Sequence, residues 1–381
     1  MNILILDAYY PRFLDSVMPQ VCEGDPDYET MRGRLLKLRF GTSDFYSRNL
    51  RALGHESQDL IFNCAPLQQQ WLLENGPRPM SPPGRWARAL ARLPFFPKPP
   101  APASYSPIDT VLSQIRKIKP DVLYMQDLNL LAPNILDDLR NEGHVGLVVG
   151  QIACPLPDPE YLAAFDLILT SFPHYVSRFR DQGIDSEYFR IAFDPVILDE
   201  IGDTAIAHEC TFVGGISPAH SGRLNFLEQL AQRVDMKFYG YGADALATDS
   251  PIASRHFGEV WGLEMYRALA RSRMTVNIHI DVAENYANNM RLYEATGSGT
   301  LLLTDMKDNL GDLFKIDEEI VTYSNLDEAV EKIRYYSAHP QAARQIALAG
   351  QRRTLASHTY PGRMTELVGI LGDYLDRKKR K

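Results

Sequence analysis

The stretch MTVNIHIDVAENYANNMRLYEATGSGTLLLTD, residues 274–305, decides the fold because it carries a strand, a helix and a second strand in succession. Its two apolar runs, MTVNIHI and TLLLTD, have the length of strands that are buried on both faces. The helix between them begins near Asn288, and Gly297 and Gly299 precede the second strand. A strand–helix–strand unit of this kind predicts a parallel sheet covered by helices.

The same alternation runs through the whole chain and predicts an α/β protein with two Rossmann-like, doubly wound domains facing a cleft. We expect domains at 1–195 and 196–360, and a final segment, 361–381, whose helix at about 360–376 crosses back to the first domain. The expected strands of the first domain are 2–7, 59–63, 121–126, 145–152, 166–170 and 188–192, and its helices are 29–53, 107–119 and 133–142. Those of the second domain are strands at 210–215, 236–242, 274–280, 300–305 and 319–324, with helices at 219–233 and 262–272.

Composition excludes several classes of protein. The chain has 381 residues and a formal net charge of -8, which argues against a general nucleic-acid binder. Its four cysteines form no CxxC pair, so the sequence indicates neither a metal cluster nor a disulfide framework. The first apolar run is short and reads as a strand, and no run approaches the roughly 20 residues of a membrane span. We therefore expect a cytoplasmic protein without a bound metal.

The segment 76–107 interrupts the alternation, since it holds 10 of the 25 prolines and no acidic residue. Arginines and one lysine alternate there with aromatic and aliphatic side chains. A proline-rich surface loop is the first interpretation. The alternative is docking of 78–100 on an acceptor or on the inner face of a membrane, with the basic C-terminal DRKKRK contributing to the same attraction.

Glycines follow the first strand of the second domain. Gly214 and Gly215 would let the backbone approach a ligand closely, and the helix that follows would present free N–H groups to an anion. Arg223 lies in the first turns of that helix and could reach a diphosphate. A tight turn between a strand and a helix uses glycines in the same way, so this motif alone leaves both interpretations open.

The next loops offer a slot for a nucleotide base. Tyr239 ends a strand, and Phe257, Gly258 and Glu259 form a loop ahead of the helix at 262–272. Backbone groups there could contact a base edge, with an aromatic wall beside it. A plain connection with a helix cap would have the same sequence.

The helix of the opening stretch offers acceptors for a ribose. Asn288, Asn289, Arg291 and Glu294 share its first turns, where a carboxylate can accept two hydrogen bonds from a diol and an arginine suits a diphosphate. The alternative is an ion pair between Arg291 and Glu294 on a solvated face.

The run 268–364 resembles the C-terminal domain of GT-B glycosyltransferases, most closely the CgeB-type bacterial group. The pieces that carry the resemblance are N-x-R-x-Y-E-A-x-G-x-G at 289–299, LLTD, AGQRR and HTYPGRM, and the first half adds YYPRFLDS and LQQQWLLENG. The resemblance implies metal-independent transfer from a nucleotide sugar, with UDP or GDP as the carrier, to a hydroxyl of a glycan, lipid-linked saccharide or protein. It also implies that Glu294 holds the donor ribose.

One position departs from the family pattern. Related retaining enzymes carry a glutamate eight residues before the ribose-binding one, and Tyr286 stands there, with Glu284 out of register. A base for an inverting transfer would come from the first domain, where Asp7, Asp127 and His174 follow strands. We expect retention rather than inversion. A catalytically silent binding subunit and a nucleotide-sugar epimerase of the same fold are the alternative functions.

Overall fold

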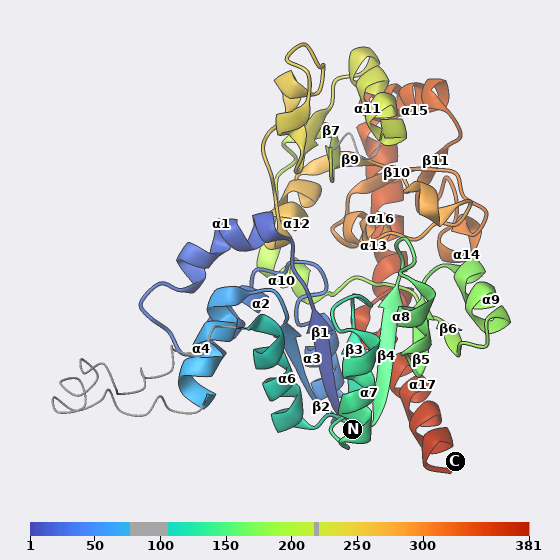
Figure 1. The fold of residues 1–381 in the computed structure, drawn as a ribbon. Coiled ribbons are helices and arrows are strands. Elements are labelled where there is room, and N and C mark those ends of the chain that lie inside the picture. The colour runs from blue at the N-terminus through green and yellow to red at the C-terminus, as the bar shows by residue number, and fades with distance from the viewer. Residues whose placement is uncertain (77–105, 217–220, 381) are drawn as a thin grey trace.

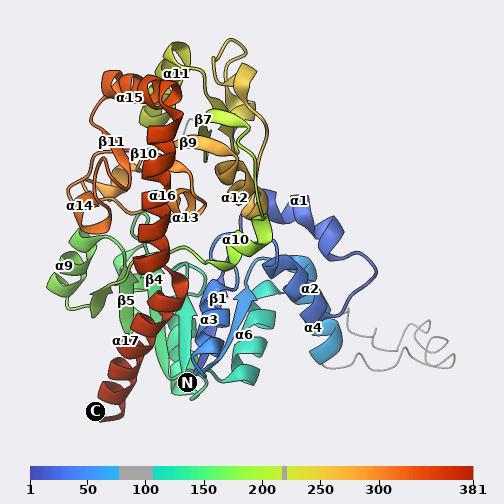
Figure 2. The ribbon, with the colours of Figure 1, turned by 180° about the vertical axis from the view of Figure 1, so that it is seen from behind.

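The structure is a computed structural model that describes residues 1–76, 106–216 and 221–380 of the chain. Figures 1 and 2 show two α/β halves, each built on one sheet, with the last long helices running past both. Apart from its ends, the basic, proline-rich segment 76–107 lies outside the described residues. Among the described residues, no helix combines the length and the apolar character needed to cross a membrane.

The first half has a six-stranded parallel sheet in the order β2-β1-β3-β4-β5-β6. Its strands are short and buried, and residues in β3 and β4 are all shielded from solvent, as expected when helices cover both faces. Its elements are β1 (Asn2–Asp7), α1 (Pro11–Val21), α2 (Tyr28–Leu36), α3 (Phe45–Ala52), β2 (Glu56–Ile61), α4 (Ala65–Asn75), α6 (Pro107–Ile118), β3 (Val122–Met125), α7 (Pro133–Asn141), β4 (Leu147–Ile152), α8 (Pro159–Ala163), β5 (Leu167–Thr170), α9 (Pro173–Asp181), β6 (Ser186–Tyr188) and α10 (Val196–Ile201).

The second half has a five-stranded parallel sheet in the order β11-β10-β9-β7-β8. Asparagine side chains cap two of its helices, Asn289 for α13 and Asn325 for α15, by accepting a hydrogen bond from the first turn. Its elements are β7 (His208–Val213), α11 (Ser221–Arg233), β8 (Lys237–Tyr239), α12 (Gly262–Ala270), β9 (Ser272–Asn277), α13 (Met290–Gly297), β10 (Leu301–Asp305), α14 (Leu310–Leu313), β11 (Val321–Tyr323), α15 (Leu326–Ala338), α16 (Pro340–Ser357) and α17 (Tyr360–Arg380), with short 3-10 turns at Ala243–Ala245, Ala253–Arg255 and Asp281–Ala283.

Two expected elements of the first half are wrong. The expected helix 29–53 is two helices, because Arg39, Gly41 and Ser43 in the connection adopt left-handed backbone conformations with φ of 60°, 57° and 47°. The last strand of the sheet lies at Ser186–Tyr188 and not at 188–192. The sequence periodicity also gave no indication of α1.

The C-terminal helix returns to the first half. The preceding helix, α16, packs against β9 and β10 of the second sheet, and α17 then packs against α3 of the first half from its first residue, Tyr360 (Figure 2). Near its end, Lys378 Nζ donates to Asp166 Oδ1 at 2.8 Å, and the Arg377 guanidinium lies 4.8 Å from the Tyr374 ring. The helix therefore continues through most of the basic tail, and at least one of its charges is used within the protein.

The strand orders fix where a ligand would bind. In the first sheet the chain turns one way from β1 to β2 and the other way to β3, and in the second sheet β7 has the same relation to β8 and β9. Ligands of doubly wound sheets bind outside the carboxyl ends of the strands at such a switch point. The residues that follow β1 and β3, and those that follow β7 and β9, are therefore the first places to examine.

Candidate functional site

Two carboxylates lie at the switch point of the first sheet. Asp7 ends β1, and its Oδ1 accepts a hydrogen bond from the Ala8 N–H at 2.7 Å. Asp127 follows β3, and its Oδ1 accepts from the Asn129 N–H at 2.9 Å. Burial raises the pKa of Asp7 from 3.8 to about 7, and the negative charge of Asp127 adds to the rise. A carboxyl group that titrates near neutral pH can accept or release a proton during a reaction.

The glycine loop lies at the switch point of the second sheet. A Cβ on Gly215 would come within 2.7 Å of the Tyr241 ring, so only glycine fits without displacing it. Arg223 Nη2 donates to the Gly215 carbonyl at 2.9 Å. Burial lowers the pKa of Arg223, whereas Tyr241 and Asp281 act against that effect. The loop, the arginine and a tyrosine thus meet at one point.

The aromatic side chain beside the glycine loop is Tyr241 and not the expected Tyr239 or Phe257. Tyr239 Oη lies 2.8 Å from His208 Nε2, and His208 begins β7, so the tyrosine side chain extends toward the amino edge of the sheet. Phe257 packs on the same two rings, with centroids 5.3 and 5.7 Å away. Tyr241 is the aromatic residue that meets the glycine loop, and its position between two glycines in FYGYG was the available indication.

The loop that contains Gly258 and Glu259 closes one side of the contact between the halves. Arg12 of α1 reaches across to Glu259 Oε1 at 2.8 Å and to Asp244 Oδ2 at 3.0 Å. Tyr10 lies edge-on to Tyr241, with ring centroids 5.9 Å apart. The Glu259 carboxylate is therefore engaged by the first half, and Gly258 supplies a backbone carbonyl to the Gly240 N–H at 3.0 Å. The sequence reasoning missed Tyr10 and Arg12.

Asn288 and Asn289 are both used within the protein. The Asn288 side chain donates to the hydroxyl of Ser171, which follows β5 of the first half. Asn289 caps α13 by accepting from the Leu292 N–H at 3.3 Å and donates to Asn277 Oδ1 at 2.8 Å. These two residues position the start of α13, one against the other half and one against the end of β9.

Arg291 and Glu294 form an ion pair, with Nη1 and Oε2 3.1 Å apart. Their side chains are only 13% and 7% exposed, so the pair does not lie on a solvated face. Burial raises the pKa of Glu294, and Arg291 opposes that rise. The groups of a buried charged pair are poorly hydrated. Such a pair at the first turns of a helix is therefore better suited to bind a ligand than a hydrated pair on the surface.

His174 and Tyr286 meet across the interface on the other side. Their rings stack with centroids 5.0 Å apart and an angle of 16°. Glu284 lies beside them and accepts from Arg178 Nη2 at 2.6 Å, with His174 Nε2 3.9 Å away. Burial lowers the pKa of His174, so the ring favours its neutral form. This geometry gives His174 a contact with the second half, and gives Tyr286 a structural role at the position where the family pattern has a glutamate.

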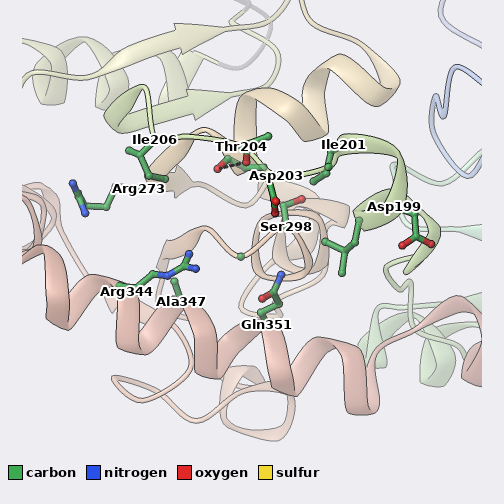
Figure 3. A pocket seen from close by; sticks show the side chains of 14 residues that line it. Asp199, Ile201, Asp203, Thr204, Ile206, Arg273, Ser298, Arg344, Ala347 and Gln351 are labelled. Atoms are coloured by element: carbon green, nitrogen blue, oxygen red, sulfur yellow. Dashed lines mark hydrogen bonds between the residues drawn. The ribbon is translucent and has the colours of Figure 1, made fainter.

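A cavity of about 650 Å³ lies at the opposite edge of the second sheet. Figure 3 shows its lining side chains, which come from α10 and the segment after it, the end of α12, the start of β9, the turn after α13, and α16. Arg273 in its wall is paired with Glu209 at 2.6 Å. The amino ends of β7, β9 and β10 border this cavity, so the rule for parallel sheets does not make it the main ligand site. Within the described part of the chain, no group of three or more histidine, cysteine or acidic side chains could hold a metal ion.

Comparisons with known proteins agree with the fold. Residues 223–369 match the family model described as glycosyl transferase-like. Sucrose-phosphate synthase from Thermosynechococcus elongatus is 10% identical, with a TM-score of 0.59 over 99% of this chain and 100% of that chain. AviGT4, a glycosyltransferase involved in avilamycin A biosynthesis, is 15% identical, with a TM-score of 0.57 over 99% and 98%. HepE of Anabaena, solved with UDP-glucose, is 10% identical, with a TM-score of 0.59 over 98% and 100%. No curated protein matches the chain.

These findings confirm the predicted fold class, because both sheets and their arrangement match GT-B structures along nearly the whole chain. The family match covers residues 223–369, a range that contains Arg223, α13, α16 and the first turns of α17.

Proposed function

We propose that the protein transfers a glycosyl group from a nucleoside-diphosphate sugar to a hydroxyl acceptor, without a metal or another cofactor. One observation carries the proposal: the switch points of the two sheets present complementary chemistry. The second half supplies a glycine loop with Arg223, which suits a diphosphate. The first half supplies the carboxylates Asp7 and Asp127, which suit proton transfer.

UDP-glucose is the first donor to test, because HepE was solved with it. GDP-sugars are the next choice. In this proposal the ribose hydroxyls donate to Glu294, and the negative diphosphate lies near Arg223 and the glycine loop. The N-x-R-x-Y-E motif at 289–294 supports placing the chain near the CgeB-type group.

For the acceptor side we propose Asp7 as the general base. Its raised pKa gives it an advantage over His174, whose ring nitrogens are buried and whose pKa is lowered. A base of this kind belongs to an inverting transfer, whereas the sequence favoured retention. The anomeric configuration of the product, read by proton NMR, decides between the two outcomes.

The acceptor would be a glycan, a lipid-linked saccharide or a protein, as in polysaccharide biosynthesis at the inner face of a membrane. Incubation with UDP-, GDP-, ADP- and dTDP-sugars, with and without simple saccharide acceptors, tests the proposal through release of the nucleotide. A stable protein that binds and turns over none of these donors would favour a silent binding subunit. Conversion of the sugar without transfer would favour an epimerase.

A further inference from the structure

His279 is a buried histidine that has no role in the function proposed above. It lies two residues after β9, and its side chain is fully shielded from solvent. Its Nδ1 lies 2.7 Å from Asp305 Oδ1, and the same oxygen accepts from the His279 backbone N–H at 3.1 Å. Two hydrogen bonds to one carboxylate oxygen fix the orientation of the ring.

This arrangement leaves the other ring nitrogen available. Because Nδ1 carries the hydrogen that bonds to Asp305, Nε2 can act toward a ligand, as an acceptor in the neutral ring and as a donor when the ring holds a second proton. Within the part of the chain that the structure describes, Nε2 is buried and has no hydrogen-bond partner. Buried polar atoms in proteins nearly always have a partner, so an atom of this kind calls for an explanation.

Another buried histidine of the chain provides the comparison. His358 Nε2 lies 2.9 Å from the Leu313 carbonyl, and among the described residues no carboxylate contacts its ring. Its Nδ1, like His279 Nε2, has no hydrogen-bond partner there. Burial lowers the pKa of His358 to about 4, as expected for a histidine that only packs and bonds to the backbone. His279 differs because its ring Nδ1 contacts a carboxylate oxygen, Asp305 Oδ1 at 2.7 Å, whereas the ring of His358 bonds to a backbone carbonyl.

The place of His279 in the fold identifies the ligand chemistry. The residues after β9 form one wall of the β7–β9 switch point, and Gly214 and Gly215 after β7 form the other. Asp281, two residues further on, lies near enough to Arg223 to act on its charge. Lys307 Nζ lies 3.4 Å from Asp305 Oδ2 and so neutralises part of the carboxylate charge. The positive charges of Arg223 and Lys307 give this crevice the character of an anion site, and His279 lies beside them.

We propose that His279 binds the diphosphate of the nucleotide donor with both ring nitrogens protonated, so that Nδ1–H donates to Asp305 and Nε2–H donates to the diphosphate. In this arrangement Asp305 is the positioning residue that orients the ring. The inference rests on the proposed function and adds a residue to its donor site. As the bond from the sugar to the diphosphate breaks, negative charge grows on the departing oxygen. A fixed donor at that point stabilises the departing group more than the intact donor.

The test compares a nucleoside diphosphate with its nucleoside. UDP, GDP, ADP and dTDP are first titrated into the wild-type protein by calorimetry, and the tightest binder is carried forward with its nucleoside. His279→Asn should weaken binding of the diphosphate about 10- to 100-fold, the size expected for loss of one charge-assisted hydrogen bond. Affinity for the nucleoside should change less than about twofold, because the base and ribose contacts remain. His208→Asn, in a histidine at the amino end of the same sheet, is the matched control and should leave both affinities unchanged.

Two further measurements separate the possible outcomes. Asp305→Asn should weaken diphosphate binding less than His279→Asn, and ¹⁵N NMR of histidine-labelled protein should show the His279 Nε2 resonance move when the diphosphate is added. Equal losses for diphosphate and nucleoside, or an unmoved resonance, would show that His279 only supports the fold. If the wild-type protein binds none of the four diphosphates, the proposed glycosyl transfer from a nucleotide sugar is itself contradicted.

Discussion

Replacement of Asp7 by asparagine separates catalysis from stability. Asp7 holds its proton up to about pH 7 in the folded protein, whereas the carboxyl of the unfolded chain releases it near 3.8. Folding therefore binds a proton between these two values, and the free energy of unfolding falls as the pH rises through this range. The difference corresponds to about 4 kcal/mol at 1.36 kcal/mol for each pKa unit. Because Asp7 keeps some contact with solvent, we expect about half of this value, roughly 2 kcal/mol.

Asp7→Asn removes this cost and keeps an oxygen for the Ala8 N–H. The variant should be more stable than wild type at pH 8 by about 2 kcal/mol and equal to it near pH 4, as measured by urea unfolding at both pH values. If Asp7 is the base, the same variant should lose about 100-fold or more of kcat at pH 8. Wild-type activity should rise with a midpoint near pH 7, and Asp127→Asn should move that midpoint to lower pH, because it removes a negative charge that raises the pKa of Asp7.

Asp59 is the matched control. It is buried on the outer strand β2 of the same sheet, and burial raises its pKa to about 7 as well. Its Oδ1 has no hydrogen-bond partner among the described residues. Asp59→Asn should stabilise the protein at pH 8 in the same way while kcat stays unchanged. Full activity of Asp7→Asn would refute the assignment of the base, and a lower stability of Asp7→Asn at pH 8 than at pH 5, each relative to wild type, would refute the raised pKa.

Three other substitutions test the donor site and the contact between the halves. Glu294→Gln should raise KM for the nucleotide sugar at least about tenfold, since one charged acceptor for the ribose diol is lost, and an unchanged KM would contradict the ribose assignment. Gly215→Ala should displace the Tyr241 ring, which a Cβ would approach to 2.7 Å, and reduce donor affinity in calorimetry; wild-type affinity would show that the loop is only a turn. Arg12→Ala removes both ion pairs to the second half and should widen the distribution of domain distances in small-angle scattering of the free protein, whereas an identical scattering curve would show that these exposed pairs contribute little.

The sequence predicts most strands of the two sheets because the central strands are short apolar runs that are buried on both faces, whereas β6, with the sequence Ser-Glu-Tyr, was misplaced. MTVNIHI and TLLLTD are such runs, and both become central strands of the second sheet. The break at 37–44 was missed because the apolar spacing continues through it, although GTSD at 41–44 is a cluster of turn-forming residues that indicates a connection. The backbone geometry at those residues depends on contacts that are distant in sequence, such as the bond from the Leu263 N–H to the Leu38 carbonyl at 2.8 Å.

The candidate site was predictable only where a motif fixes a residue at a strand end or a helix start. Gly214, Gly215, Arg223 and Glu294 are of this kind. Tyr241 and His279 were missed because the contacts that make them candidates come from neighbours distant in sequence: Gly215, which follows β7, in one case and Asp305 at the end of β10 in the other. For Tyr239 the sequence predicted the position in the strand correctly but not the direction of the side chain, which extends to His208 at the amino edge of the sheet.

The contacts between the halves link domain closure to the residues predicted to bind the donor. Glu259 pairs with Arg12, and Asn288 donates to Ser171, so the side chain of each contacts the opposite half. On the far side the stack of His174 on Tyr286 joins the same two sheet edges. A ligand that binds one of these side chains must break its contact with the opposite half. A ligand that binds both switch points at once would hold the two halves together in place of that contact. Donor affinity and the distance between the halves should therefore be coupled, with the two switch points as the place where that coupling acts.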